Sequence, residues 1–168
     1  RWWVVVNASN RAKDVAWMQA HSQGFDLELE DLSDRTYMLA LQGPKAQAIL
    51  QKLTPADLAA MPFHSGLETT VAGVPAVLGA TGYTGEYGYE LFFPVEQAAL
   101  IWNTLLDTGK EEGLLPCGLA ARDSLRFEPC LPLYGHEIDQ VTDPFSARLG
   151  WAVGFAKGDF VGRDALLK

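Results

Sequence analysis

The chain has 168 residues, of which 48% are hydrophobic and 20% are charged, and this composition excludes a disordered protein. The excess of 21 acidic over 13 basic residues gives a formal net charge of -8, which repels phosphate backbones and anionic lipid headgroups. We therefore expect no nucleic-acid partner. The apolar runs are far shorter than the roughly 20 residues that cross a bilayer, so we expect no membrane partner either.

Residues 1–62 are predicted to form part of a first subdomain. Apolar runs or apolar–polar alternation indicate strands at 2–6, 25–30 and 37–41. Capping side chains followed by apolar residues at near-helical spacing predict a helix at about 10–22. Proline is favoured at the first position of a helix, which predicts one helix after Gly43-Pro44 and another from Thr54-Pro55 to Met61.

Residues 63–145 are predicted to form a second α+β subdomain, and residues 146–168 a return strand with the start of another helix. Short β-rich runs separated by glycine predict an antiparallel meander at 67–71, 74–80 and 89–93. Amphipathic spacing predicts helices at 95–106 and 118–127, a last strand is expected at 150–155, and a terminal helix opens near 159–163. The fold class is therefore α+β, with antiparallel sheets and packed helices in two intertwined subdomains.

Four glycines fall within ten residues between Gly79 and Gly88, between two apolar strands. Glycines let a backbone approach a ligand closely, and Tyr83 offers a flat face on which an aromatic ring can stack. A tight hairpin is the alternative interpretation. The pattern is no dinucleotide fingerprint, because a strand follows it rather than a helix.

Glu90 begins the next strand among apolar neighbours, where a carboxylate needs a partner. Two adjacent donors on a pterin-like or guanidine-like ring would satisfy both of its oxygens. The alternative is a solvated charge at a strand end.

Arg122 and Arg126 lie four residues apart, on one face of a predicted helix, and can grip an anion such as the carboxylate tail of a folate. A surface ion pair with Asp123 or Glu128 is equally compatible with the pattern. Asn7 can either hydrogen-bond to an amide-bearing ring or cap a helix.

Two further patterns bear on catalysis and metal binding. The loop 132–139 gathers an aromatic residue, a histidine and two acids, which suits either a general base or a structural loop. Cys117 and Cys130 lack the CxxC spacing of zinc sites, and no histidine lies at helical spacing from another ligand, so no metal is expected. Reduced thiols fit a cytoplasmic protein.

Seven segments in consistent order resemble the glycine cleavage T-protein family of aminomethyltransferases. They cover nearly the whole chain, and Pro129-Cys130 departs from the family, which more usually has Ala-Gly there. The matching runs are Val5–Asn10 with Lys13-Asp14, Leu41–Ala46, Gly82–Glu86, Gly88–Glu90, Cys117–Arg126, Pro132–Asp139 and Asp159–Arg163.

The resemblance implies transfer of a one-carbon unit from the aminomethyl group on the lipoyl arm of the H-protein to tetrahydrofolate, with release of ammonia. It implies that Glu90 pairs with the pterin, that Arg122 contacts the polar part of the folate, and that Asn7 and Tyr83 line the same cavity. It also implies that the catalytic aspartate precedes residue 1 and that a barrel-like domain follows residue 168. The chain is thus expected to be an inactive piece of a longer enzyme, from a bacterial cytoplasm or a mitochondrial matrix.

Three alternatives to that enzyme stay open at the level of sequence. One is a non-catalytic folate-binding module of the same superfamily, and another is a relative that demethylates sarcosine or dimethylglycine. The third is a structural piece whose candidate site residues serve only packing.

Overall fold

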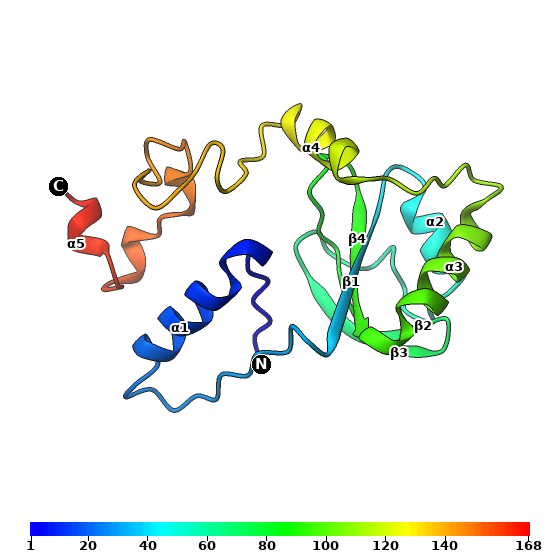
Figure 1. Ribbon diagram of the computed structural model, residues 1–168, viewed down its shortest axis with the longest axis horizontal. Coiled ribbons are helices and arrows are strands. Elements are labelled where there is room, and N and C mark those ends of the chain that lie inside the picture. Colours follow the sequence, from blue (N-terminus) through cyan, green and yellow to red (C-terminus); the bar gives the residue numbers. More distant parts are fainter. The chain divides into compact units, whose positions relative to one another are not determined.

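The structure is a computed structural model that describes all residues, 1–168, in two compact units, Arg1–Pro129 and Cys130–Lys168. The first unit holds every strand and most of the helices (Figure 1). Its elements are α1 (Arg11–His21), β1 (Thr36–Gln42), α2 (Ala46–Gln51), β2 (Gly66–Val71), β3 (Val74–Gly79), β4 (Gly88–Pro94), α3 (Ala98–Gly109) and α4 (Leu119–Phe127).

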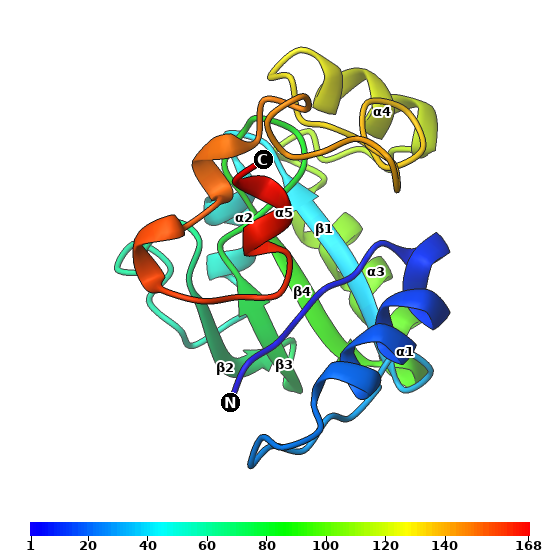
Figure 2. The ribbon, with the colours of Figure 1, turned by 90° about the vertical axis from the view of Figure 1, so that its left-hand side faces the viewer.

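The four strands form one antiparallel sheet in the order β1-β4-β3-β2. The predicted meander of β2, β3 and β4 is confirmed, and β1 joins its β4 edge by pairing Leu39 with Leu91. Helices α2 and α3 lie on one side of this sheet (Figures 1 and 2). The predicted α+β fold with an antiparallel sheet is therefore confirmed.

The core lies between that side of the sheet and the two helices. Alternate strand residues point into it, as the two-residue period of a strand requires, and Leu78 and Leu91 are fully buried. Ile101 of α3 and Leu50 of α2 close the core from the other side. The sheet is thus held by its helix-covered face, and its second face is left for other contacts.

The N-terminal segment lies over the second face. Trp3 packs on Phe92 with ring centroids 6.1 Å apart, and Arg1 approaches Glu68 of β2 at 3.8 Å. In Figure 2 this segment, drawn in dark blue, crosses in front of the strands. It is extended, but it forms no strand, and the predicted strand at 2–6 is wrong.

The predicted strand at 25–30 is also wrong. Both segments have the apolar residues of a strand, but neither finds a strand to pair with, and a ladder requires one. Their side chains are correspondingly exposed, with Trp2 at 94% and Phe25 at 69%. The local sequence pattern gives both segments a propensity to form strands, but no neighbouring strand is present to pair with either of them.

The predicted helix from Thr54 to Met61 is a series of turns instead. Side chains take the backbone donors that would have started a helix, since Thr54 Oγ1 accepts from the amide of Ala56 and Asp57 Oδ1 accepts from the amide of Ala59. Such local hydrogen bonds compete with helix formation.

The second unit consists of turns, short 3-10 segments and the single helical turn α5 (Arg163–Leu166). The predicted strand at 150–155 is wrong, because Gly150–Ala152 forms a 3-10 turn and Trp151 is 84% exposed. The helix predicted near 159–163 begins at Arg163. The three-part division at residues 62 and 145 remains a prediction, although one sheet takes β1 from the first part and β2–β4 from the second.

Candidate functional site

The glycine-rich segment forms an irregular loop over residues 80–87 between β3 and β4, rather than a tight hairpin. Gly85 is the one glycine of Gly79, Gly82, Gly85 and Gly88 with a positive φ, at 75°, and it packs against Pro129. Gly79, Gly82 and Gly88 instead allow neighbouring side chains to approach the backbone closely. A Cβ on Gly82 would lie 1.9 Å from Oε1 of Gln42, a distance that no real Cβ contact has.

Glu90 lies on the second face of the sheet, where it is half-buried. Its carboxylate accepts a hydrogen bond from Oγ1 of Thr81 at 2.5 Å and forms no ion pair. Across the ladder its neighbours are Ala40 of β1 and Gly79 of β3. The side chain of Thr81 covers Gly79, whereas Ala40 is small and exposed, so a planar ring can approach the carboxylate from the β1 side.

Tyr83 and Arg122 meet, although they lie on the loop and on α4. The guanidinium carbon of Arg122 sits 4.4 Å from the centroid of the Tyr83 ring, within the range of a cation–π contact. The guanidinium is exposed and forms no ion pair, so its N–H groups remain available to an anion. Stacking on the Tyr83 ring orients the Arg122 guanidinium, which suits recognition of a carboxylate.

Arg126 is separated from this arrangement. It is 4% exposed, and its Nε and Nη2 each reach Oδ1 of Asp123 at 2.8 Å. The two arginines of α4 therefore differ in surroundings, since Arg126 is buried and ion-paired while Arg122 is exposed and stacked.

The sequence interpretation missed Gln42, which links the end of β1 to this loop. Oε1 of Gln42 accepts from Thr84 Oγ1 at 3.0 Å, and Nε2 donates to the carbonyl of Thr81 at 3.2 Å. The only sequence signal was the pair of glycines at 82 and 88, which allow a neighbouring side chain to approach the backbone closely. Nothing in the local pattern tells that this neighbour is 40 residues away on another strand.

Asn7 is not brought into contact with the other three predicted residues. Its Oδ1 accepts from the amide of Ser9 at 3.2 Å and from Ser9 Oγ at 2.7 Å, which caps the short 3-10 turn Ala8–Asn10. The capping interpretation describes its hydrogen bonds in this structure.

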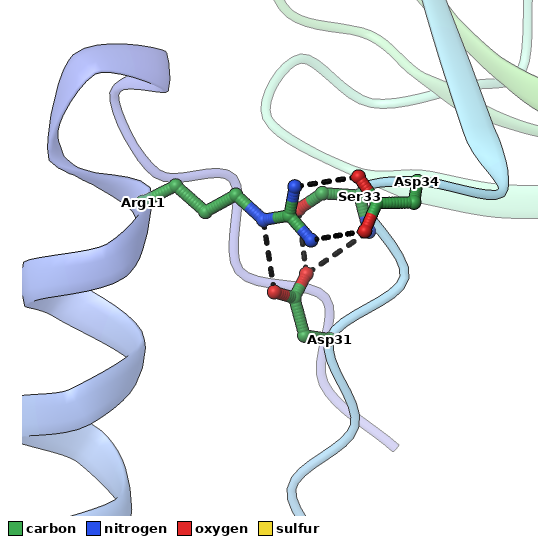
Figure 3. Close-up of polar contacts among 4 residues, drawn as sticks. All are labelled: Arg11, Asp31, Ser33 and Asp34. Atoms are coloured by element: carbon green, nitrogen blue, oxygen red, sulfur yellow. Dashed lines mark hydrogen bonds and ion pairs between the residues drawn. The ribbon is translucent and has the colours of Figure 1, made fainter.

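The segment that carries Asn7 is anchored one turn later by Arg11 (Figure 3). Nη1 and Nη2 of Arg11 donate to the two oxygens of Asp34 at 2.7 and 2.8 Å, and Nε donates to Asp31 at 2.9 Å. Hydrogen bonds from Ser33 and then from Arg11 lower the pKa of Asp31 to about 2, and Arg11 lowers the pKa of Asp34. Helix α1 is thus joined to the loop before β1 by a bidentate ion pair.

Two hollows open on the first unit, and none of the four predicted residues lines them. One, of about 290 Å³, is lined by Pro44, Phe63, Tyr87 and Tyr89 among others. The other, of about 360 Å³, lies on the second face under Trp3 and Phe92. The predicted cavity shared by Glu90 and Arg122 is therefore not one of these two hollows.

The loop 132–139 in the second unit has structural hydrogen bonds of its own. Glu137 Oε2 accepts from the amide of Leu133 at 2.9 Å, and the amide of Gly135 donates to the carbonyl of Ile138 at 2.8 Å. No group of three or more His, Cys, Asp or Glu side chains is placed to hold a metal ion. None of the helices has the length and apolar composition needed to span a membrane.

Comparison with known proteins gives the family. Residues 1–157 match the family described as the GCVT N-terminal domain. The chain belongs to the GCVT N-terminal domain family. The resemblance to glycine cleavage T-proteins, drawn from seven short segments, is thereby confirmed.

Relatives of this GCVT domain cover almost all of it. The aminomethyltransferase of Herpetosiphon aurantiacus is 50% identical over 165 residues, which are 98% of this chain and 45% of that protein. The aminomethyltransferase of Geobacillus thermodenitrificans is 50% identical over 167 residues, 97% of this chain and 45% of that protein. The chain thus spans less than half the length of these curated relatives.

Solved structures agree with the fold. The crystal structure of glycine cleavage system aminomethyltransferase T from Bartonella henselae has a TM-score of 0.82 and 35% identity, and the match covers 96% of this chain and 43% of that one. A heterotetrameric sarcosine oxidase from Corynebacterium has a TM-score of 0.52 and 24% identity over 62% of this chain and 53% of that chain, which shows a common fold alone.

Proposed function

We propose that this GCVT domain is the tetrahydrofolate-binding part of an aminomethyltransferase of the glycine cleavage system. The whole enzyme transfers the one-carbon unit from the aminomethyl-lipoyl arm of the H-protein to tetrahydrofolate and releases ammonia. Relatives named aminomethyltransferase, 50% identical along nearly the whole chain, support the proposal. The observation that carries it is the half-buried Glu90 carboxylate, which has no basic partner and lies beside the small, exposed Ala40 of β1.

Glu90 has the chemistry to recognise a pterin. A reduced pterin presents a ring N–H and an amino group side by side, and a carboxylate can accept from both at once. Thr81 already donates to one oxygen of Glu90, which fixes the carboxylate and leaves further lone pairs for the ring. The small, exposed Ala40 that flanks Glu90 across the ladder leaves room for the flat heterocycle on the β1 side.

Arg122 and Tyr83 suit the other end of the same ligand. The glutamate tail of a folate is anionic, and a guanidinium held on a ring offers it two parallel N–H donors. Tyr83 is two residues from Thr81, so the stacked pair and the Glu90 carboxylate are joined through one loop. We assign the pterin to Glu90 and the polar part of the folate to Arg122.

Asn7 completes the proposed site from the N-terminal segment. It follows Trp3 by four residues, a reach of at most about 14 Å in extended chain, and Trp3 sits on Phe92, two residues from Glu90 along β4. The amide of Asn7 can therefore reach the face that carries Glu90 if the 3-10 turn that it caps opens when ligand binds.

The catalytic aspartate and the H-protein surface belong to the remainder of the proposed enzyme. A general base must lie within hydrogen-bond reach of the proton that it moves, and the family resemblance puts that aspartate before Arg1. We propose no catalytic residue in this chain and no turnover by this chain alone. We place the enzyme in a bacterial cytoplasm or a mitochondrial matrix. We also propose that this chain divides into three parts, with boundaries at residues 62 and 145.

The test is a calorimetric titration of tetrahydrofolate, kept anaerobic, into the chain and into Glu90→Gln. Loss of the charged acceptor should weaken binding by about tenfold or more, because hydrogen bonds to a charged group are worth about 1.5–3 kcal/mol. Glu96→Gln, in the 3-10 turn before α3, is the matched control and should bind like the wild type. Equal affinity in all three proteins, or no binding by the wild type, would refute the assignment.

A further inference from the structure

Gln42 connects both ends of the loop between β3 and β4. Its Nε2 donates to the carbonyl of Thr81 at 3.2 Å and to the carbonyl of Tyr89 at 3.5 Å, and it also reaches the carbonyl of Leu41 at 3.3 Å. Its Oε1 accepts from Thr84 in the middle of the loop. One half-buried amide thus makes contacts before, within and after the loop.

Gly82 of the loop and Gly88 at the start of β4 both leave space for this side chain. A Cβ on Gly82 would lie 1.9 Å from Oε1 of Gln42, and a Cβ on Gly88 would lie 2.3 Å from its Nε2. Neither glycine has a positive φ, so neither is required by backbone conformation. They allow the backbone at 82 and 88 to approach the Gln42 amide closely. Any larger residue at either position would collide with this side chain.

We propose that Gln42 is a positioning residue that sets the geometry of the ligand-contacting loop and so the relative placement of Glu90 and Tyr83. The inference rests on the proposed function for its ligand. Thr81 is the link, because its carbonyl accepts from Gln42 while its hydroxyl donates to Glu90. Tyr83 lies between Thr81 and Thr84, both of which contact the same amide.

The amide of Gln42 is required, and a carboxylate of the same shape cannot replace it. In Gln42→Glu the Thr84 hydroxyl can still donate to the side chain, but the carbonyls of Thr81 and Tyr89 then face an acceptor. The loop would lose the donor contacts at its two ends and keep the one in its middle. The variant therefore tests hydrogen-bond donation without removing the volume that Gly82 and Gly88 enclose.

Gln51 provides a matched control in the same unit. From α2 its Nε2 donates to the carbonyl of Ala56 at 2.7 Å, and its Oε1 accepts from the amide of Leu58 at 3.0 Å. It thus holds another loop by the same chemistry, away from Glu90. Gln51→Glu reproduces the change in charge and in donor number, without touching the proposed site.

The experiment combines tetrahydrofolate titration with hydrogen exchange of the whole chain. Gln42→Glu should weaken binding by about tenfold or more and speed exchange of the amides at 82–88. Gln51→Glu should speed exchange near 54–58 and leave affinity within about twofold of the wild type, as remote changes do. Equal affinity and equal loop exchange in Gln42→Glu and wild type would overturn the inference, as would equal losses of affinity in the two variants.

Gly82→Ala tests the same inference if Gln42→Glu fails to fold. The three atoms nearest to its new Cβ all belong to Gln42, so the substitution should weaken binding in the wild-type background and have little further effect in Gln42→Ala. Additive effects would contradict a role through Gln42. If the wild type binds no tetrahydrofolate, the proposed function fails, and the exchange data still decide whether Gln42 orders the loop.

Discussion

The two units differ in what holds them together. Every buried residue of the chain lies between Leu41 and Arg126, and all of the buried hydrophobic side chains lie between Leu41 and Leu105. In residues 130–168 no residue is buried, and the hydrogen bonds in their turns run mainly between close neighbours in sequence. Helix α1 likewise has no buried residue.

The difference teaches that apolar composition alone does not make a core. Trp151 and Val141 in the second unit are as hydrophobic as the residues of the sheet, yet they are 84% and 89% exposed. The strands of the first unit bury their side chains because antiparallel pairing lines up one apolar face that two helices can cover. Stability is therefore expected to be concentrated in the sheet.

The largest expected effect is on global unfolding. Leu91→Ala in the central strand removes a fully buried side chain and should lower the free energy of unfolding by about 2–5 kcal/mol. Val141→Ala in the second unit should change it by less than about 0.5 kcal/mol. Urea unfolding curves of the two variants measure this, and similar midpoints would contradict a core confined to the sheet.

Hydrogen exchange of the unmodified chain should rank the regions in the same order. Amides of β4, paired on both sides, should exchange at least about a hundredfold more slowly than those of α1 and of α5, because local opening costs less where no side chain is buried. Exchange read by mass spectrometry of peptides provides the comparison. Equal protection of α1 and β4 would show that α1 shares the core.

A smaller gain in stability is expected at the start of the second unit. Cys130 has φ of 59°, in the left-handed region where glycine is favoured, and the family resemblance puts glycine there. Cys130→Gly should raise the free energy of unfolding by up to about 1 kcal/mol, since the relieved strain of about 1–2 kcal/mol exceeds the entropy cost of glycine. Cys117→Gly is the control, because Cys117 has no positive φ and should gain nothing.

The smallest effect concerns the anchor of α1 and its pH dependence. Asp31 has a folded pKa of about 2 against an ordinary value of 3.8, so its contribution is fully present above pH 3.8 and is lost as pH falls through 2. Carbon NMR titration of the carboxyl groups reads this directly. In Arg11→Met the pKa of Asp34 should return toward 3.8, whereas Asp31 should stay low because Ser33 still donates to it.

If both carboxyls shifted equally in Arg11→Met, the bonds from Ser33 would have no separate role. Protection of the α1 amides at pH 6 in the same variant tests the anchor itself. Lys13→Met, two residues further along the helix, is the matched control and should leave the pKa of Asp34 unchanged. An unchanged α1 in both variants would place the anchor elsewhere.

The sequence predicted the elements that follow from local rules. Short β-rich runs separated by glycine located the meander, and amphipathic spacing located α3 and α4, because these patterns are properties of one strand or helix by itself. It failed at 2–6, 25–30 and 150–155, where the strand pattern was present and a pairing partner was not. The helix predicted at 54–61 is wrong, because the side chains of Thr54 and Asp57 accept hydrogen bonds from the backbone amides of this segment.

Of the candidate site, the sequence by itself determined the residue types and the family, namely a carboxylate at 90, a guanidinium at 122 and a loop rich in glycine and tyrosine. Only the tertiary structure decided that Arg122 stacks on Tyr83, that Arg126 is buried against Asp123, and that Gln42 fills the space left by Gly82. The reason is physical. Residue chemistry and periodicity are local, whereas a stack or a hydrogen bond between segments 40 residues apart exists only after the sheet has brought them together.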